Sequence, residues 1–291
     1  MNTPFNFRLT KFPNEAEILR LEVREFLSEA LKDIPKETRA ETWYGADENF
    51  SRKVGQKGWI GLNWPKEHGG AGRSSMERYV ILEEMLTAGA PVGAHWISDR
   101  QSGPLIIRYG TEKHQKELLP GILKGESYFC IGMSEPDSGS DLAALRTKAE
   151  KKGNIYLVNG TKLWTSGAHR CQYMIALFKT SQEEDRHGGF SQFIVDLSLP
   201  GVTIRPIIDL AGRHHFNEVI FEDVEVPEDM LIGTEGNGWN QVTAELALER
   251  SGPERYLSSY MLLQELVSEF SNKNDDEGVT EIGRQMSHLT T

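Results

Sequence analysis

Two stretches decide the fold of the middle of this chain: residues 128–149, YFCIGMSEPDSGSDLAALRTKA, and residues 160–168, GTKLWTSGA. In the first, a small-residue loop follows an apolar, strand-like run, and in the second an alternating run ends in Ser and Gly. Between about 128 and 228 the hydrophobic period is two, and Asn159-Gly160 predicts a hairpin turn. Short strands without helical spacers predict an antiparallel sandwich or barrel.

Helical periodicity flanks this β region on both sides. The stretch EAEILRLEVREFLSEAL places Leu19 and Val23 on one face, and SSMERYVILEEMLTAG repeats the pattern, with Glu83 and Glu84 expected on a solvated face. Helical spacing returns after the turn-rich PEDMLIGTEGNGW, and Pro253 is expected to kink that helix or start another. The predicted fold is therefore α+β and multidomain: an N-terminal helical domain at 1–127, a β domain at 128–232 and an incomplete helical domain at 233–291.

Composition excludes several classes of function. A formal net charge of −11 over 291 residues argues against a general nucleic-acid binder, which needs a basic surface. No signal peptide opens the chain and no apolar run approaches the length of a membrane span, so we expect a cytoplasmic protein without membrane insertion. Cys130 and Cys171 are expected to be small hydrophobes rather than a disulfide. The pair His214-His215 lacks further ligands at a fixed spacing, so no metal is expected.

The quoted stretches resemble the flavin-binding signature of the acyl-CoA dehydrogenases. Three further stretches are similar to that family in the same order: GWIGLNWPKEHGG at 58–70, IIRYGTEKHQKELLPGILKGE at 106–126 and HFNEVIFEDVEVPEDMLIGTEGNGW at 215–239. The resemblance implies the acyl-CoA dehydrogenase fold, with FAD as the cofactor of an oxidoreductase of fatty-acid and lipid metabolism. A buried flavin needs hydrogen-bond partners along its polar edge. The resemblance assigns these contacts to Met133, Ser134, Gly139, Ser140, Trp164 and Ser166.

The resemblance also suggests the acid–base residues. In a subset of the family similar to isovaleryl- and long-chain acyl-CoA dehydrogenases, the catalytic base is a Glu followed by Arg on the helix after the β domain. This chain reads ELALERSGPERYL at 245–257, which assigns the base to Glu249 and contact with the CoA part of the substrate to Arg250. Val242, Leu246 and Glu249 share one helical face. Glu245, one turn earlier, is the competing carboxylate.

The activity implied is α,β-dehydrogenation of an acyl-CoA thioester to the 2,3-enoyl-CoA, with an electron-transfer flavoprotein as acceptor. Two alternatives stay open: a flavin oxidase or monooxygenase of the same fold, and a non-catalytic or incomplete subunit that needs a partner chain. The second arises because only the first helices of the family's C-terminal bundle are expected here, so the chain is predicted to form a homo- or hetero-oligomer. The polar run at 98–102, SDRQS, suggests a polar or bulky acyl group.

Overall fold

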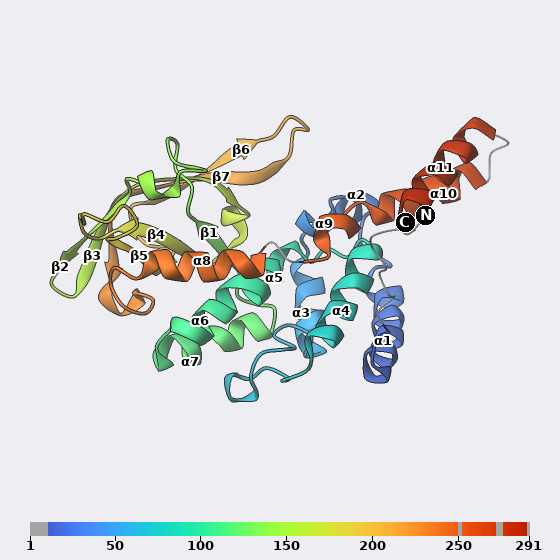
Figure 1. Cartoon of the computed structure of the whole chain (residues 1–291), viewed down its shortest axis with the longest axis horizontal. Helices are drawn as coiled ribbons and strands as arrows, with labels where there is room; N and C mark the ends of the chain where they lie inside the picture. The colour runs from blue at the N-terminus through green and yellow to red at the C-terminus, as the bar shows by residue number, and fades with distance from the viewer. Residues whose placement is uncertain (1–10, 250–251, 272–275, 290–291) are drawn as a thin grey trace, which may run out of the picture. The chain divides into compact units, whose positions relative to one another are not determined.

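The computed structural model describes residues 11–249, 252–271 and 276–289. They form two compact units that alternate along the chain (Figure 1). Unit 1 takes its residues from 1–42, 73–90 and 253–291, and unit 2 takes its residues from 43–72 and 91–252. The three-domain division of the chain stays a prediction.

Unit 1 is helical. Its helices are α1 (Asn14–Ala30), α2 (Lys36–Ala40), α4 (Ser75–Thr87), α9 (Glu254–Leu257), α10 (Tyr260–Ser271) and α11 (Asp276–Leu289). Helix α1 packs its buried stripe, which includes Leu19 and Val23, against α4. A capping box between Ser74 and Glu77 starts α4, and Gly89 follows its end with φ +65°, a conformation that glycine adopts without strain. The helical periodicity read from the sequence is confirmed here.

Glu84 does not lie on a solvated face, and that expectation is wrong. Its side chain is buried against α1, where its carboxylate accepts hydrogen bonds from the Arg20 and Arg24 guanidinium groups at 2.5 Å and 2.7 Å. Glu83 also pairs with Arg20, at 2.5 Å. The apolar period of α4 could not show this, because the basic partners are about 60 residues away in sequence.

Unit 2 combines short helices with the sheet. Its helical elements are η1 (Thr42–Tyr44, whose first residue belongs to unit 1), α3 (Glu48–Gln56), η2 (Lys66–His68), α5 (Gly93–Ile97), η3 (Ser98–Ser102), α6 (Gly103–Tyr109), α7 (Glu112–Leu123), η4 (Leu142–Ala144), η5 (Ala168–Arg170), η6 (Glu228–Met230) and α8 (Gly238–Glu249). The segment η3 is a π-helical turn between α5 and α6. Such turns interrupt the regular backbone ladder and occur often at functional sites.

The sheet has seven strands. They are β1 (Phe129–Gly132), β2 (Lys148–Lys152), β3 (Ile155–Ser166), β4 (Tyr173–Lys179), β5 (Phe190–Asp196), β6 (Val202–Ile208) and β7 (His214–Pro227). Their order is β1-β4-β2-β3-β7-β6, with β5 paired to β4. Most neighbours are antiparallel, as predicted, but β2 pairs with β4 in parallel at Lys148 and Lys179, and β1 runs parallel to β4 along its length. A parallel neighbour needs a long connection, and the β2–β3 hairpin lies within this one.

The hairpin turn lies elsewhere than the sequence predicts. Strand β3 continues through Asn159-Gly160, and the turn between β2 and β3 is at Gly153, where φ is +65°. Gly160 instead lies beside a register shift, where two residues of β7, Glu222 and Asp223, face the single residue Asn159 of β3. There the Asn159 side chain exchanges hydrogen bonds with Asp223, at 3.0 Å and 2.9 Å, so its turn-forming chemistry serves a cross-strand contact.

The core of unit 2 lies inside the curled sheet. Cys130 of β1 is fully buried there among β-branched and aromatic side chains, as expected, and Cys171 is half-buried beside it. Both cysteines are free thiols. Helix α8 covers β5 (Figure 1). It also contacts η3. Within the described ranges, no helix has the length and apolar character needed to cross a membrane.

Candidate flavin site

The stretches at 128–149 and 160–168 lie side by side in unit 2. The loop after β1 is bonded directly to β3: the Leu163 N–H donates to the Ser134 carbonyl oxygen at 2.8 Å, and the Lys162 ammonium donates to the Met133 carbonyl oxygen at 3.1 Å. Met133 also packs on the small core beneath α8. The main chain of the first stretch is therefore fixed next to the second.

A buried ion pair anchors this junction. The Lys162 ammonium lies 2.8 Å from a Glu135 carboxylate oxygen, and the exposed fractions of the two side chains are 0% and 6%. The same carboxylate accepts the backbone N–H groups of Arg146 at 2.6 Å and Thr147 at 3.0 Å. Sequence reasoning did not single out either residue of the pair. The available signal was a lysine at a strand position whose period predicts an inward side chain.

Burial and pairing act in opposite directions on these two groups. Burial lowers the pKa of Lys162 to about 8, and the Glu135 carboxylate offsets only part of that effect. Burial would raise the pKa of Glu135, but the Lys162 charge and the hydrogen bonds from Lys162, Thr147 and Arg146 outweigh it, so its pKa lies below the usual value. Both groups are therefore charged at neutral pH.

The Trp164 side chain is exposed on strand β3, two residues after Lys162. Strict alternation along β3 would put it on the same inward face as Lys162, but the pairing with β7 shifts between Lys162 and Thr165. Trp164 adopts φ +62°, a backbone conformation that is rare outside glycine, and 56% of it is exposed. Its ring meets that of Phe216 edge to face at 5.8 Å. A strained, exposed indole is typical of a ligand contact.

The other residues assigned to the cofactor lie along the same loop and strand. Gly139 and Ser140 are exposed, and no described atom comes within 4 Å of where a Cβ on Gly139 would stand. The hydroxyls of Ser138 and Thr165 are buried and lack a hydrogen-bond partner among the described residues. Ser166 ends β3 and is half-buried.

Ser166 lines a small cavity of about 50 Å³. Two stacked imidazoles, His169 and His214, form part of its wall with ring centroids 3.8 Å apart. Both rings bond the Asn217 side-chain oxygen, at 3.2 Å and 2.7 Å. Burial, with the nearby His214 and Arg170 charges, lowers the pKa of His169 to about 4, so that ring is neutral at physiological pH. Across the described residues, no group of three or more His, Cys, Asp or Glu side chains could hold a metal ion.

Helix α8 carries the predicted acid–base residues. Glu249 is its last described residue, one turn after Glu245; the Glu249 side chain and the whole of Arg250 lie outside the described residues. Glu245 is buried, and its carboxylate accepts a hydrogen bond from the Gln192 amide of β5 at 3.0 Å. The competing carboxylate thus has a defined place in the core of unit 2.

The polar run at η3 is buried as a whole. Asp99 accepts the backbone N–H of Gly61 at 2.7 Å, and the Ser98 hydroxyl accepts that of Phe129 at 2.9 Å. The Arg100 guanidinium lies over the Trp96 ring, 4.7 Å from its centroid. Buried polar residues are unfavourable unless they are bonded; Ser98 and Asp99 meet this need through neighbouring segments, whereas the Ser102 hydroxyl has no hydrogen-bond partner among the described residues.

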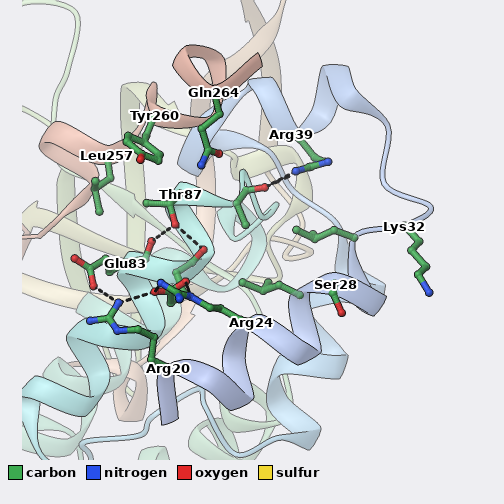
Figure 2. A pocket seen from close by; sticks show the side chains of 14 residues that line it. Arg20, Arg24, Ser28, Lys32, Arg39, Glu83, Thr87, Leu257, Tyr260 and Gln264 are labelled. Atoms are coloured by element: carbon green, nitrogen blue, oxygen red, sulfur yellow. Dashed lines mark hydrogen bonds and ion pairs between the residues drawn. The ribbon is translucent and has the colours of Figure 1, made fainter. Parts of the chain in front are cut away.

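Unit 1 holds a separate cleft of about 920 Å³ (Figure 2). Figure 2 shows Arg20 and Arg24 reaching from α1 toward the carboxylates of α4, and Arg39 bonded to the Ala88 carbonyl oxygen at 2.8 Å. None of the residues assigned to the flavin or to catalysis lines this cleft within the described part of the chain. Its charged groups serve mainly to bind each other.

The residues of unit 2 fit a flavin. Trp164 offers an exposed ring, and the Met133–Ser134 main chain is held beside it. Ser138 and Thr165 supply buried hydroxyls that need partners, which is the pattern of a surface built to receive a polar ligand edge. The open space over Gly139 leaves room for close approach to the main chain.

Comparisons with known proteins identify the family of this chain. Residues 13–126 match the N-terminal domain of acyl-CoA dehydrogenases, and residues 130–224 match their middle domain. Acyl-CoA dehydrogenase FadE29 of Mycobacterium tuberculosis is 38% identical over 84% of this chain, which spans 64% of the length of FadE29. Acyl-CoA dehydrogenase FadE26 of the same organism is 33% identical over 94% of the chain, which spans 70% of FadE26.

A solved structure gives the same result for the fold. The Tcur3481-Tcur3483 steroid ACAD superimposes with a TM-score of 0.86 and 31% identity, over 96% of this chain and 74% of that one. The order of a helical N-terminal part, a β part and further helices is therefore the one that the sequence predicted, although the sheet is mixed rather than purely antiparallel. By sequence and by fold, this chain belongs to the acyl-CoA dehydrogenase family.

Proposed function

We propose that this chain is the flavin-binding part of an FAD-dependent acyl-CoA dehydrogenase, which converts an acyl-CoA thioester to its 2,3-enoyl-CoA. One observation carries the proposal: the Met133–Ser134 main chain and the exposed, strained Trp164 are fixed side by side in unit 2. Bound FAD would supply the acceptor for the β-hydride. Everything else in the reaction falls to side chains and main-chain groups of the protein.

Each of the assigned residues has a task that its chemistry suits. Met133 and Ser134 would bond the polar edge of the flavin, and Ser166 would donate its hydroxyl near the reacting nitrogen. Trp164 would pack beside the ring and exclude water from it. Gly139 and Ser140 would bind the cofactor phosphates, where an exposed main chain with open space above it permits contact.

Glu249 is proposed to remove the α-proton, with Arg250 holding the CoA part of the substrate. Support comes from the position of Glu249 at the end of α8, on the helix that covers β5 and contacts η3. A carboxylate that serves as base works best when partly desolvated, because its pKa then rises toward the operating pH. Glu245 is the weaker candidate because its carboxylate is already bonded to Gln192 in the core.

The proposed substrate carries a bulky or polar acyl group. Support comes from the buried polar turn η3, which contacts the helix that carries Glu249. A relative of similar fold is described as a steroid ACAD. We also propose that the chain works in an oligomer, as does the relative described as the ChsE4-ChsE5 complex of Mycobacterium tuberculosis, and that an electron-transfer flavoprotein takes the electrons.

The test is anaerobic reduction of the reconstituted protein. The full chain is loaded with FAD and mixed with a panel of acyl-CoA esters, linear and polycyclic, while the visible absorbance of the flavin is followed. We expect a polycyclic ester to bleach the flavin. Glu249→Gln should slow the bleaching by about 10³-fold or more, as expected for a lost general base, whereas the matched variant Glu245→Gln should leave its rate within about 10-fold.

The other outcomes identify the alternatives. If Glu245→Gln abolishes bleaching and Glu249→Gln does not, the base is Glu245. If oxygen admitted after the anaerobic reduction reoxidises the flavin as fast as the acyl-CoA reduced it, the chain is an oxidase or monooxygenase of the same fold. If the chain binds acyl-CoA and never bleaches, it is a non-catalytic or incomplete subunit.

A further inference from the structure

Lys162 occupies an unusual environment for a lysine. Its side chain is fully buried, and its ammonium donates to a Glu135 carboxylate oxygen at 2.8 Å and to the Met133 carbonyl oxygen at 3.1 Å. The Phe178 ring lies on another side, with its centroid 5.6 Å from the ammonium. Burying an ammonium group is unfavourable unless it is paired and bonded in this way. An apolar residue at this strand position would avoid that penalty, so the charge calls for a physical role.

Glu135 extends the pair to two further segments. Its carboxylate accepts the N–H groups of Arg146 and Thr147, which directly precede β2. Its own main chain forms a tight turn with Ser138: Glu135 N–H donates to the Ser138 carbonyl at 2.9 Å, and Ser138 N–H returns a bond at 3.1 Å. One ion pair therefore joins the loop after β1, the entry to β2 and strand β3.

The position of Trp164 depends on the same anchor. Strand β3 leaves its regular pairing directly after Lys162, and the Leu163 N–H is bonded to the Ser134 carbonyl oxygen. Trp164 follows in the left-handed conformation, pointing away from the core. With Lys162 and Leu163 both bonded to the loop, a change in the pair would move the loop and the indole relative to each other.

We propose that Lys162 and Glu135 are positioning residues that clamp the Met133–Ser134 main chain at a set place beside Trp164, and that loss of the Lys162 proton loosens this clamp. The inference rests on the proposed function, because the clamped groups are those assigned to the flavin. Neither residue needs to touch the cofactor: the pair acts through the backbone of the loop and the strand.

Proton loss is accessible near neutral pH. Burial brings the pKa of Lys162 to about 8. The charged group that faces its ammonium is Glu135; Arg146 presents only its backbone N–H to the pair, since its guanidinium is exposed and lies 3.4 Å from Asp137. The described residues of β4 present the Phe178 ring there, which does not titrate. A neutral amine keeps donors but loses the charge that makes its bond to Glu135 strong.

The first test needs no flavin. The indole N–H signals of the full chain are recorded by ¹H–¹⁵N NMR from about pH 6.5 to about pH 9.5, a range that brackets the pKa of Lys162, and Trp164→Phe assigns the signal of Trp164. We expect that signal to titrate with a midpoint near pH 8, and to do so equally in the control Lys151→Met, which removes an exposed lysine of the same sheet. In Glu135→Gln/Lys162→Met the signal should be displaced at every pH and should not titrate.

Stability over the same range separates a clamp from simple unfolding. The pKa of Lys162 is lower in the folded chain than the ordinary lysine value, so the folded state binds fewer protons above pH 8 and this group adds stability as pH rises. As the pH rises, the Trp164 signal should therefore change, whereas the loss of the Lys162 proton should not lower the urea midpoint. A Trp164 signal that is independent of pH in the parent chain overturns the proposal, whether or not the variants fold.

The second test measures FAD affinity by the quenching of flavin fluorescence. We expect the double variant to bind FAD about 10-fold more weakly than the parent chain, and Lys151→Met to bind it equally well. Equal FAD affinity of the double variant overturns the positioning role. If the parent chain binds no FAD while its Trp164 signal titrates as expected, the clamp stands and the proposed flavin function fails.

Discussion

Each unit of this protein holds a buried glutamate with basic partners, and the two clusters behave differently. In unit 1, Glu84 is bonded to Arg20 and Arg24, whose side chains are 13% and 59% exposed at the edge of an open cleft (Figure 2). In unit 2, Glu135 is bonded to a lysine with no exposure at all. The acid is the same, but the access of water to the base differs.

The consequence appears in the pKa of the basic group. Burial would lower the pKa of Arg20, but bonds and charges from Glu84 and Glu83 outweigh it, so the pKa is raised and the group never titrates. For Lys162 the effect of burial is larger than the opposing effect of its single carboxylate partner, so its pKa falls to about 8. A guanidinium has delocalised charge and five donors, whereas an ammonium depends on a compact hydration shell. The Glu84 cluster of unit 1 therefore stays charged at every physiological pH, whereas the Glu135–Lys162 pair of unit 2 can respond to pH.

The largest effect is expected from Lys162→Met. Removing the ammonium leaves the Glu135 carboxylate buried without its charge partner, which should lower the free energy of unfolding by about 3–5 kcal/mol. Urea unfolding followed by circular dichroism measures it. The double variant Glu135→Gln/Lys162→Met should recover most of the loss, because no charge is then buried. A single variant as stable as the double would mean that the pair is not coupled.

Glu84→Gln should have a smaller effect. Water in the cleft can solvate Arg20 and Arg24 once the carboxylate is gone, so we expect a loss of about 1–2 kcal/mol. The same urea experiment checks this value. A loss as large as that of Lys162→Met would show that the cleft excludes water and would remove the contrast between the two clusters.

The pH dependence of stability should distinguish the clusters next. With a folded pKa of about 8 and an ordinary value of 10.5, Lys162 should add about 1 kcal/mol between about pH 7.5 and about pH 9, whereas the arginines of unit 1 should add nothing. The free energy of unfolding is measured against pH for the parent chain and for Glu135→Gln/Lys162→Met. The difference between the two curves gives the contribution of Lys162, because the other titrating groups are common to both. Parallel slopes would mean that Lys162 keeps an ordinary pKa.

Arg24→Ala is expected to change least. Its guanidinium is largely exposed and Glu84 keeps Arg20, so the loss should be about 0.5 kcal/mol or less and should shrink further in high salt. Lys32→Ala, at an exposed pair with Glu29, is the matched control and should give a similar value. A loss of stability well above that of Lys32→Ala would show that Arg24 contributes to the buried Glu84–Arg20 ion pair.

Periodicity predicted much of the fold. The stripe containing Leu19 and Val23 and the start of α8 were readable because amphipathic spacing reports which face is buried. The Asn159-Gly160 hairpin was wrong because a dipeptide that favours a turn can also lie within a strand, opposite a bulge of the neighbouring strand, and only the register with β7 separates the two. Glu84 was misplaced because its partners are distant in sequence.

For the candidate site, too, the sequence predicted some residues and missed others. Met133, Ser134 and Trp164 were found from the sequence because the family signature is contiguous, although their role toward a flavin remains a proposal. Glu135 and Lys162 were missed: the inward strand position of Lys162 was the available signal, but its pairing with Glu135 appears only when the loop and strand are brought together. The assignment of Glu249 and Arg250 still rests on the sequence, because the Glu249 side chain and Arg250 lie outside the described residues.

The sequence by itself determined the family, the helical and β regions, and the two stretches that meet at the candidate site. Local spacing and contiguous motifs carry that information. Only the tertiary structure decided that Trp164 turns outward at a bulge and that Lys162 lies buried against Glu135. Solvent exclusion and strand register are set by residues far apart in the chain, and these two properties control both the pKa of Lys162 and the exposure of Trp164.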